Sequence, residues 1–247
     1  AGVFDAAGDP VAAVDNNGKM FATYIAFDRT TPDNGIYVQT SVDNGSNWAA
    51  PVAVAAHTGG GASDFEDKPY ACCDYSPGSP NLNNFYITWT RFATSGATPI
   101  YFSKSTNGGT SFTAPVQISS STNTQFSCPT VGPNGEVYVV WFDYSSGNIK
   151  FDKSTNAGVN WGADITVASF NDNFPANACG TFRQAAYPVI ACDISGSPRH
   201  GWIYVSWVSN TNGNPDVFFS RSTNGGTSWS AATRVDNDAT GRWQWFH

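Results

Sequence analysis

The segment Ser222-Thr-Asn-Gly-Gly-Thr-Ser-Trp229 has three close copies earlier in the chain. They are Ser41-Val-Asp-Asn-Gly-Ser-Asn-Trp48, Ser105-Thr-Asn-Gly-Gly-Thr-Ser-Phe112 and Ser154-Thr-Asn-Ala-Gly-Val-Asn-Trp161. We call these four segments the box turns. An Asp or Asn at the third position folds its side-chain oxygen onto backbone N–H groups, Gly at the fifth permits a positive φ, and the last aromatic is a large apolar anchor. We interpret the box turns as structural.

The residues that carry this structural role are Asp43, Gly45, Trp48, Asn107, Gly109, Phe112, Asn156, Gly158, Trp161, Asn224, Gly226 and Trp229. Three of the four turns have Asn at the third position, which keeps the acceptor oxygen and removes the charge. The turns are therefore not predicted to bind a metal ion, and no metal site or cofactor is predicted elsewhere in the chain.

A second repeated feature precedes each box turn and sets the period of the repeat. It begins at Pro10, Pro69, Pro129 and Pro188, which lie 59, 60 and 59 residues apart. An apolar segment follows each proline and ends in an aromatic at Phe27, Trp89, Trp141 and Trp207. Each unit of about 60 residues thus reads as four short strands joined by Gly, Asn and Pro turns, which is typical of a β-propeller blade.

This pattern predicts an all-β fold built from four-stranded antiparallel blades. One propeller domain is expected over residues 1–247, with blades at approximately 10–68, 69–128, 129–187 and 188–247. A blade cannot bury both of its faces alone, so the blades must stack side by side.

The box turns resemble the Asp box, also called the BNR repeat, and the chain is similar to the sialidase-type β-propeller superfamily over nearly its full length. Propellers of that type resemble six-bladed rings. The next marker proline would fall one residue beyond position 247. We therefore expect the four blades to belong to a ring of six or more, completed by a longer parent chain or by other copies. A compact four-bladed ring is the alternative.

Composition excludes some partners. The net charge is −7 and no run of basic residues occurs, which argues against nucleic acid because phosphate binding needs clustered Lys and Arg. No apolar stretch approaches the roughly 20 residues of a membrane span. Few lysines and many Asn, Ser and Thr favour an extracellular or cell-surface location. The cysteine count is five, and Cys128 and Cys179 are the pair we expect if a disulfide forms.

In this architecture the face opposite the box turns carries the connections between strands 2 and 3 and those from strand 4 to the next blade. Two candidate ligand-binding arginines, Arg29 and Arg91, come two residues after the strand-2 aromatic, where the later repeats have Asp143 and Ser209. The candidates expected in the strand 4 to strand 1 connections are Arg183, Gln184, Arg242, Glu66 and Asp67.

The resemblance to sialidases implies three arginines that clamp a substrate carboxylate, a Tyr nucleophile paired with a Glu, and an Asp acid/base. No candidate arginine is followed two residues later by proline, as the Arg-Ile-Pro motif of sialidases requires. Glu66 and Glu136 are the two Glu in the chain, and Glu136 is expected on the opposite side.

Two function classes follow. The favoured one is a carbohydrate-directed module that binds a glycan or a protein on the loop face, since aromatic and amide side chains suit sugar recognition. The alternative is a sialidase-like glycoside hydrolase. For that role the candidates are Asp67 and Asp143 as the paired carboxylates, supported by Glu66 and Tyr144. Asp boxes occur in both enzymes and non-catalytic surface proteins, so the fold does not decide between them.

Overall fold

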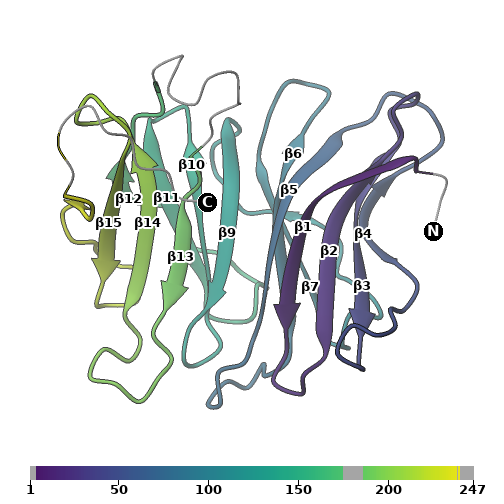
Figure 1. The fold of residues 1–247 in the computed structure, drawn as a ribbon, viewed down its shortest axis with the longest axis horizontal. Helices are drawn as coiled ribbons and strands as arrows, with labels where there is room; N and C mark the ends of the chain where they lie inside the picture. Colours follow the sequence, from purple (N-terminus) through teal and green to yellow (C-terminus); the bar gives the residue numbers. More distant parts are fainter. Residues whose placement is uncertain (1–3, 175–185, 238, 240–247) are drawn as a thin grey trace.

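The computed structural model describes residues 4–174, 186–237 and 239, which form sixteen β-strands and no helix. The strands make four separate four-stranded sheets in which neighbours along the chain pair antiparallel (Figure 1). The predicted all-β architecture of four antiparallel blades is confirmed. None of the described residues belongs to a helix long and apolar enough to cross a membrane.

Each blade takes four consecutive strands. The first blade has β1 (Ala6–Val14), β2 (Met20–Phe27), β3 (Asn34–Ser41) and β4 (Val52–His57). The second has β5 (Phe65–Cys73), β6 (Phe85–Phe92), β7 (Ile100–Ser105) and β8 (Val116–Gln117). The third has β9 (Thr124–Val131), β10 (Val137–Asp143), β11 (Asn148–Ser154) and β12 (Ile165–Ser169). The fourth has β13 (Val189–Cys192), β14 (Ile203–Ser209), β15 (Asp216–Ser222) and β16 (Thr233–Arg234).

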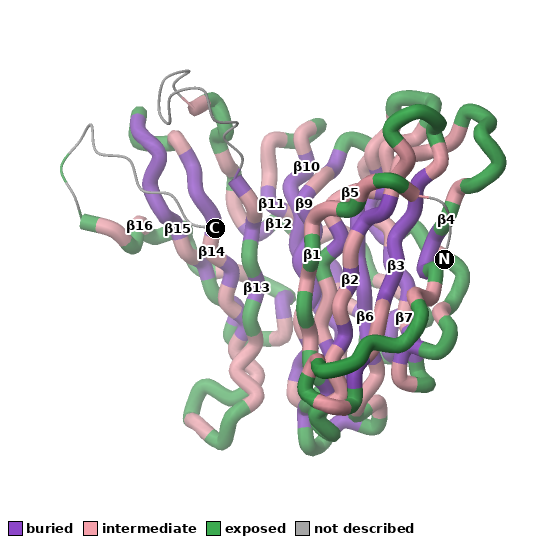
Figure 2. The backbone as a smooth tube through the Cα atoms, turned by 45° about the vertical axis from the view of Figure 1, so that its right-hand side comes forward, coloured by how far each residue is buried: buried purple, intermediate pink, exposed green. Residues whose placement is uncertain are grey.

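The first strands of the blades are the innermost ones, because β1 contacts β5, β5 contacts β9, and β9 contacts β13. Three of the marker prolines lie inside or near the end of an innermost strand, and Pro188 directly precedes β13. Because the strands alternate in direction, the box turns at the ends of β3, β7, β11 and β15 share one rim (Figure 1). The buried residues concentrate on the strands and the exposed ones on the loops at both rims (Figure 2).

The pairing register corrects the alignment of the first repeat. The serine that begins each box turn pairs with Met20, Phe85, Val137 and Ile203, respectively. Four residues further along each second strand stand Tyr24, Trp89, Trp141 and Trp207. Tyr24, and not Phe27, is therefore the counterpart of the three tryptophans. The counterpart of Arg91 is consequently Ala26 and not Arg29.

Inside each box turn the serine hydroxyl organises the backbone. Ser154 Oγ donates to Asn156 Oδ1 at 2.9 Å and accepts from the N–H of Gly158 at 2.8 Å. In the first turn Ser41 Oγ donates to Asp43 Oδ1 at 2.8 Å in the same way. The Asp and Asn versions thus make the same hydrogen bond, because each offers a side-chain oxygen at the same place.

The box turns of the second, third and fourth blades pack on the blade before them. Trp161 lies edge-on to Phe102, with ring centroids 5.0 Å apart, and Trp229 lies edge-on to Phe151 at 5.2 Å. Gly158 lies so close to Phe102 that an added Cβ would stand 2.3 Å from the ring. The fifth position of the turn must therefore be glycine for a packing reason as well as for its positive φ.

A lysine of the preceding blade also contacts each of these three turns. Lys104 Nζ donates to the carbonyl of Ala157 at 2.6 Å, and Lys153 Nζ donates to the carbonyl of Gly225 at 2.8 Å. Lys19 Nζ donates to the carbonyl of Gly108. We call this contact the seam latch. It joins an ammonium of one blade to the fourth residue of the next box turn.

A comparison of Gly158 with Gly45 distinguishes the cost of lost packing from the cost of backbone strain. Both have φ near +80° (77° and 82°), so alanine at either site costs about 1–2 kcal/mol of backbone strain. At Gly45 the nearest atom to an added Cβ is 3.7 Å away, whereas at Gly158 the buried Phe102 ring would have to move. We expect Gly158→Ala to lose a further ~1–3 kcal/mol of unfolding free energy. Urea denaturation of the two variants measures this difference, and equal losses would contradict the seam packing.

Asp152, on β11, is a buried carboxyl with an incomplete set of partners. Its Oδ1 accepts from the N–H groups of Lys153 and Gly162, while its Oδ2 is buried without a hydrogen-bond partner. Burial raises the pKa of Asp152 to about 6. The position is Ser103 in the second blade and Ser220 in the fourth, so the charge is not needed for the fold.

The raised pKa of Asp152 predicts a pH-dependent stability. The unfolded chain releases this proton near pH 3.8 and the folded chain near pH 6, so the contribution is fully present below the unfolded pKa and is lost as pH rises through about 6. We expect Asp152→Asn to gain about 2–3 kcal/mol of unfolding free energy over the wild type at pH 7, and to gain little at pH 4. Denaturant melts at both pH values check this, and a pH-independent difference would refute it.

Candidate functional site

The residues just before the four marker prolines differ from blade to blade. They are Asp9, Lys68, Cys128 and Tyr187. Asp9, Lys68 and Tyr187, which come from three different blades, line one cavity of about 210 Å³ together with Pro10, Val11, Pro69 and Tyr70. We call Asp9, Asp67, Lys68, Tyr70 and Tyr187 the axial cluster.

Two β-bulges place the charged members of the axial cluster. The register shifts between Gly8 and Val11 on β1 and between Asp67 and Tyr70 on β5. In such a bulge two residues of one strand stand opposite a single residue of the partner strand, which re-aims a side chain. These residues are Asp9 and Pro10 on β1 and Lys68 and Pro69 on β5, and Asp9 and Lys68 have φ of 49° and 55°.

Both bulged residues also precede a proline, whose ring disfavours the helical regions of φ/ψ space for the residue before it. A non-glycine residue held in a sparsely populated region costs roughly 1–3 kcal/mol, and such residues cluster at functional sites. The innermost strands therefore hold two strained positions side by side. Their side chains meet at the cavity.

An ion pair joins the two bulges. Lys68 Nζ lies 2.9 Å from Asp9 Oδ2, and the two side chains are 22% and 35% exposed. Burial alone lowers the pKa of Lys68, but the hydrogen bond and the charge of Asp9 outweigh it, so the net shift is upward. The ammonium is thus charged at neutral pH, and part of the Lys68 side chain remains exposed.

Asp67 adds a second carboxyl beside this pair. Its Oδ1 accepts from the N–H of Lys68 at 2.9 Å. Burial raises the pKa of Asp67; the Lys68 ammonium opposes this rise, and the Asp9 carboxylate adds to it. Two carboxyls in different surroundings therefore stand next to one ammonium.

Two tyrosines supply the aromatic part of the cavity. Tyr187 lies edge-on to Phe126 with ring centroids 4.4 Å apart, which fixes its ring at the start of the fourth blade. Tyr70 is 37% exposed, and burial raises the pKa of its hydroxyl, which is therefore a neutral donor at pH 7. The cavity combines apolar ring faces with directional donors and acceptors.

Glu66 and Arg91, both predicted for the loop face, lie together in a buried network. Glu66 is fully buried on β5, and its Oε1 receives Arg91 Nη2 at 2.6 Å and His57 Nε2 at 2.9 Å. Its Oε2 accepts from Trp89 Nε1 at 2.5 Å. Arg91 also lies over the Tyr101 ring, 3.9 Å from the centroid. Both charged groups are thus engaged within the protein.

Asp143 and Tyr144 lie at the β10–β11 turn, on the third blade. Asp143 is buried, and its carboxylate accepts from Ser121 Oγ, the N–H of Ser145 and Ser146 Oγ at 3.0, 3.0 and 2.8 Å. Tyr144 packs edge-on against Phe170, with ring centroids 5.6 Å apart. Asp143 acts here as the cap of its own turn.

The remaining predicted residues divide between the first blade and the undescribed part of the chain. Arg29 is exposed and lies 3.9 Å from Asp5 Oδ1, and its backbone N–H donates to the same carboxylate. Arg183, Gln184 and Arg242 lie outside the described residues. Cys128 lies on β9, and Cys179, its proposed disulfide partner, also lies outside the described residues.

The structure brings Asp67, which the sequence analysis chose as a candidate carboxylate, together with Asp9, Lys68, Tyr70 and Tyr187. Asp67 and Lys68 lie within β5 and not in a connection, because the pairing with β6 continues to Phe65 past the bulge. One signal could have identified the cluster. While the marker proline repeats, the residue before it changes from Asp to Lys, Cys and Tyr. Among the residues that the structure describes, no group of three or more His, Cys, Asp or Glu could hold a metal ion.

No protein-family model and no curated protein sequence matches the chain. Solved structures do. The leech intramolecular trans-sialidase matches with a TM-score of 0.68 at 10% identity, over 94% of this chain and 51% of the other. The intramolecular trans-sialidase from Ruminococcus gnavus also has a TM-score of 0.68 at 10% identity, over 94% and 71%. A polysaccharide lyase, an ulvan lyase, has 0.58 at 13%, over 92% and 55%.

The chain spans about half of the length of the leech and polysaccharide-lyase structures. At such low identities the likeness is one of fold. Four antiparallel blades with their innermost strands side by side, superposing on several sialidases, show that the chain has the sialidase-type β-propeller fold.

Proposed function

We propose that the chain binds a carbohydrate at the axial cluster. The observation that carries this proposal is the cavity where Asp9, Lys68, Tyr70 and Tyr187 from three blades meet. Sugar rings are recognised by apolar contact with aromatic faces and by directional hydrogen bonds to hydroxyls, and the cavity offers both. The solved structures of similar fold include sialidases and a polysaccharide lyase, which supports a carbohydrate ligand. An extracellular or cell-surface location remains part of the proposal and rests on composition.

The charge of the cluster favours a neutral sugar over an acidic one. Asp9 and Asp67 supply two carboxyls against the single ammonium of Lys68. A carboxylate-bearing sugar needs planar arginine forks, and the described candidates Arg29 and Arg91 are bound to Asp5 and Glu66. A ligand with hydroxyls alone avoids repulsion from the carboxylates.

Tyr187→Ala and Lys68→Met test this site. We expect each variant to lose at least about tenfold in affinity for neutral oligosaccharides, equivalent to ~1.4 kcal/mol, because one loses the ring face and the other the ammonium donor. Isothermal titration against lactose, cello-oligosaccharides and sialyllactose measures the affinities. We expect sialyllactose to bind more weakly than lactose.

Tyr75→Ala is the matched control, since Tyr75 is 53% exposed and follows the end of β5, at the rim that carries the box turns. It should bind like the wild type, and unfolding curves show whether each variant is folded. Equal losses in all three variants, or no binding of any sugar by the wild type, would refute the proposal. Preferred binding of sialyllactose would refute its neutral-sugar part.

Glycoside hydrolysis is a second candidate function, favoured by the raised pKa of Asp67 beside the Asp9 carboxylate. A carboxyl whose pKa is raised by burial suits a proton donor, and a second carboxylate beside it can complete an acid and base pair. In this reading Asp67 is the proton donor. Asp143 is held by contacts within its turn and Glu66 by an ion pair. The candidate pair of catalytic carboxyls is therefore Asp67 and Asp9.

If Asp67 is the acid, kcat/KM on a fluorogenic neutral glycoside falls as pH rises through the raised pKa of Asp67, because the protonated form is lost. We expect Asp67→Asn to abolish turnover while it retains binding of the same sugar. If the wild type binds the sugar and does not hydrolyse it, the proposed binding function stands and the proposed catalytic function is refuted.

A further inference from the structure

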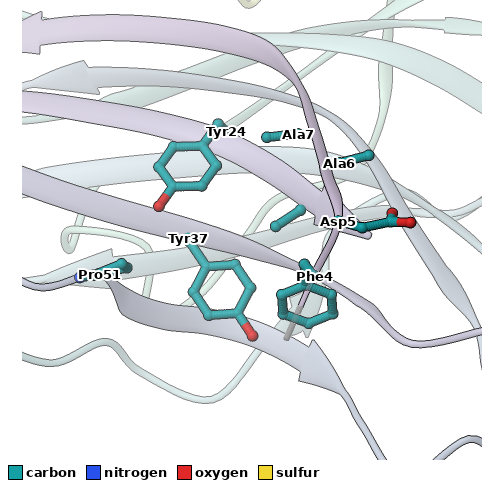
Figure 3. Close-up of a pocket in the computed structure, with 8 residues that line it drawn as sticks. Phe4, Asp5, Ala6, Ala7, Tyr24, Tyr37 and Pro51 are labelled. Atoms are coloured by element: carbon teal, nitrogen blue, oxygen red, sulfur yellow. The ribbon is translucent and has the colours of Figure 1, made fainter. Parts of the chain in front are cut away.

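The fifth residue of each second strand is a Tyr or Trp, and its polar atom has different surroundings in different blades. In the first blade it is Tyr24, which lines a cavity of about 330 Å³ (Figure 3) and donates its hydroxyl to Gln39 Oε1 at 3.1 Å. In the second blade Trp89 donates its indole N–H to Glu66 Oε2. In the third blade Trp141 Nε1 is buried without a hydrogen-bond partner among the described residues.

Three hydroxyls share this condition with Trp141. They belong to Thr88 and Thr90 on β6 and to Ser127 on β9, and each is buried without a partner among the residues that the structure describes. The four side chains are at most 1% exposed. A buried polar group without a hydrogen bond is costly, because it has given up its bonds to water and gained none in return.

Trp141 and the two threonines face one another across the seam between the second and third blades. Trp141 packs in one core cluster with Tyr86 of the second blade. Tyr86, Thr88 and Thr90 are alternate residues of β6, and alternate residues of a strand share one face of the sheet. The two hydroxyls therefore lie on the face of β6 that meets Trp141.

Ser127 adds a third hydroxyl to this seam from the third blade. The register shift between β9 and β10 places Ser127 opposite Trp141. Its neighbour Cys128 belongs to the core cluster that the third blade shares with the fourth. Because successive side chains of a strand point to opposite faces, Ser127 points toward the second blade. One N–H donor and three hydroxyls thus share a single seam.

The next seam shows that the fold does not need polar groups at these places. Val140 and Phe142 are the fourth and sixth residues of β10, as Thr88 and Thr90 are of β6. Both pack in one core cluster with Trp207. Trp207 Nε1 is also buried without a partner in the described part of the chain, but its neighbours at these two places are apolar.

A shorter side chain beside Trp141 leaves its indole N–H unpaired. Thr124 takes the place that Glu66 has beside Trp89, because each pairs with the residue two places after its tryptophan. The Thr124 hydroxyl donates instead to the carbonyl of Thr98 at 2.8 Å. The carboxylate that accepts from the indole in the second blade therefore has no equivalent in the third.

We propose that the seam between the second and third blades binds internal water at Trp141 Nε1 and the hydroxyls of Thr88, Thr90 and Ser127. A buried water molecule makes about three hydrogen bonds to otherwise unsatisfied polar groups, and these four groups supply that number. The water accepts from the indole N–H, as the Glu66 carboxylate does in the second blade. It donates to the hydroxyls or accepts from them, because a hydroxyl does both.

The water site borders the axial cluster. Thr88 pairs with Tyr70, and Thr90 pairs with Asp67, across the β5–β6 ladder. Residues that pair directly in an antiparallel ladder have their Cβ atoms about 5 Å apart on the same face. The bound water therefore continues the polar surface of the axial cluster into the wall of the second blade.

Thr88→Val and Thr23→Val compare a hydroxyl at the water site with one outside it. Thr23 is the fourth residue of β2, and its hydroxyl is also buried without a partner among the described residues. The indole beside it, that of Trp89, is already bonded to Glu66. We expect Thr88→Val to lower the ratio of folded to unfolded protein by at least about fivefold, because the water loses a partner. Thr23→Val should leave this ratio unchanged or raise it, and urea denaturation measures both.

The direction of the Thr88→Val effect distinguishes a hydrated seam from a dry one. In a dry seam the hydroxyl is an unsatisfied buried group, and its replacement by a methyl group stabilises the protein. A higher ratio of folded to unfolded protein in Thr88→Val would thus overturn the proposal. Equal losses in the two valine variants would overturn it as well, because they would show that only packing had changed.

The wild type supplies a second test that does not depend on a variant that folds. In an isotope-labelled sample, the indole N–H of Trp141 should show a nuclear Overhauser cross-peak to a long-lived water molecule. The indole N–H of Trp89, which donates to Glu66, is the matched control and should show none. Loss of one indole signal in Trp141→Phe identifies the resonance. A missing cross-peak at Trp141, or equal cross-peaks at both indoles, would overturn the proposal.

Discussion

The contact of a box turn with the blade before it, made by the second, third and fourth blades, is the interaction on which the rest of this structure depends. A single four-stranded sheet has two apolar faces and cannot bury both alone. The buried glycine against an aromatic ring, as at Gly158 and Phe102, lets two blades approach closely. The latch from Lys104 to Ala157 then fixes their offset along the strands. With that offset set at one rim, the innermost strands meet in a defined register at the centre.

This constraint explains why the axial cluster can hold strained residues. Asp9 and Lys68 keep a positive φ before a proline because the flanking parts of β1 and β5 remain paired on both sides of each bulge. The strand pairing on both sides of each bulge holds these residues in the strained conformation and offsets its energetic cost. The result is an ammonium and a carboxylate from different blades 2.9 Å apart. A loop could not hold them so firmly.

Much of the fold could be predicted from the sequence, because the box turns and marker prolines are local signals. The number of blades, the strand order and the rim of the box turns all followed from them. The exact register did not, since the first blade has aromatics at both Tyr24 and Phe27 and only the ladder shows which one faces the seam. The bulges could not be foreseen either, because they arise from pairing across two strands.

The candidate site was predicted less well, for a physical reason. Glu66 and Arg91 look like functional charges in a sequence, and only the packing shows that they neutralise each other in the interior. Asp67 was found, yet its neighbours Asp9 and Tyr187 lie 58 and 120 positions away along the chain. No local pattern connects residues so far apart. Only the period of the repeat, read one residue before each proline, does so.

The position of these residues has an evolutionary consequence. The first, second and fourth blades contribute Asp9, Lys68 and Tyr187 to the cavity from the place just before the marker proline, while the box-turn contacts between blades lie at the rim. Exchange of one of these blades by recombination would thus replace one wall of the cavity and leave the box-turn contacts between blades unchanged. The selectivity of such a scaffold is modular, and it can diverge repeat by repeat without a search for a new fold.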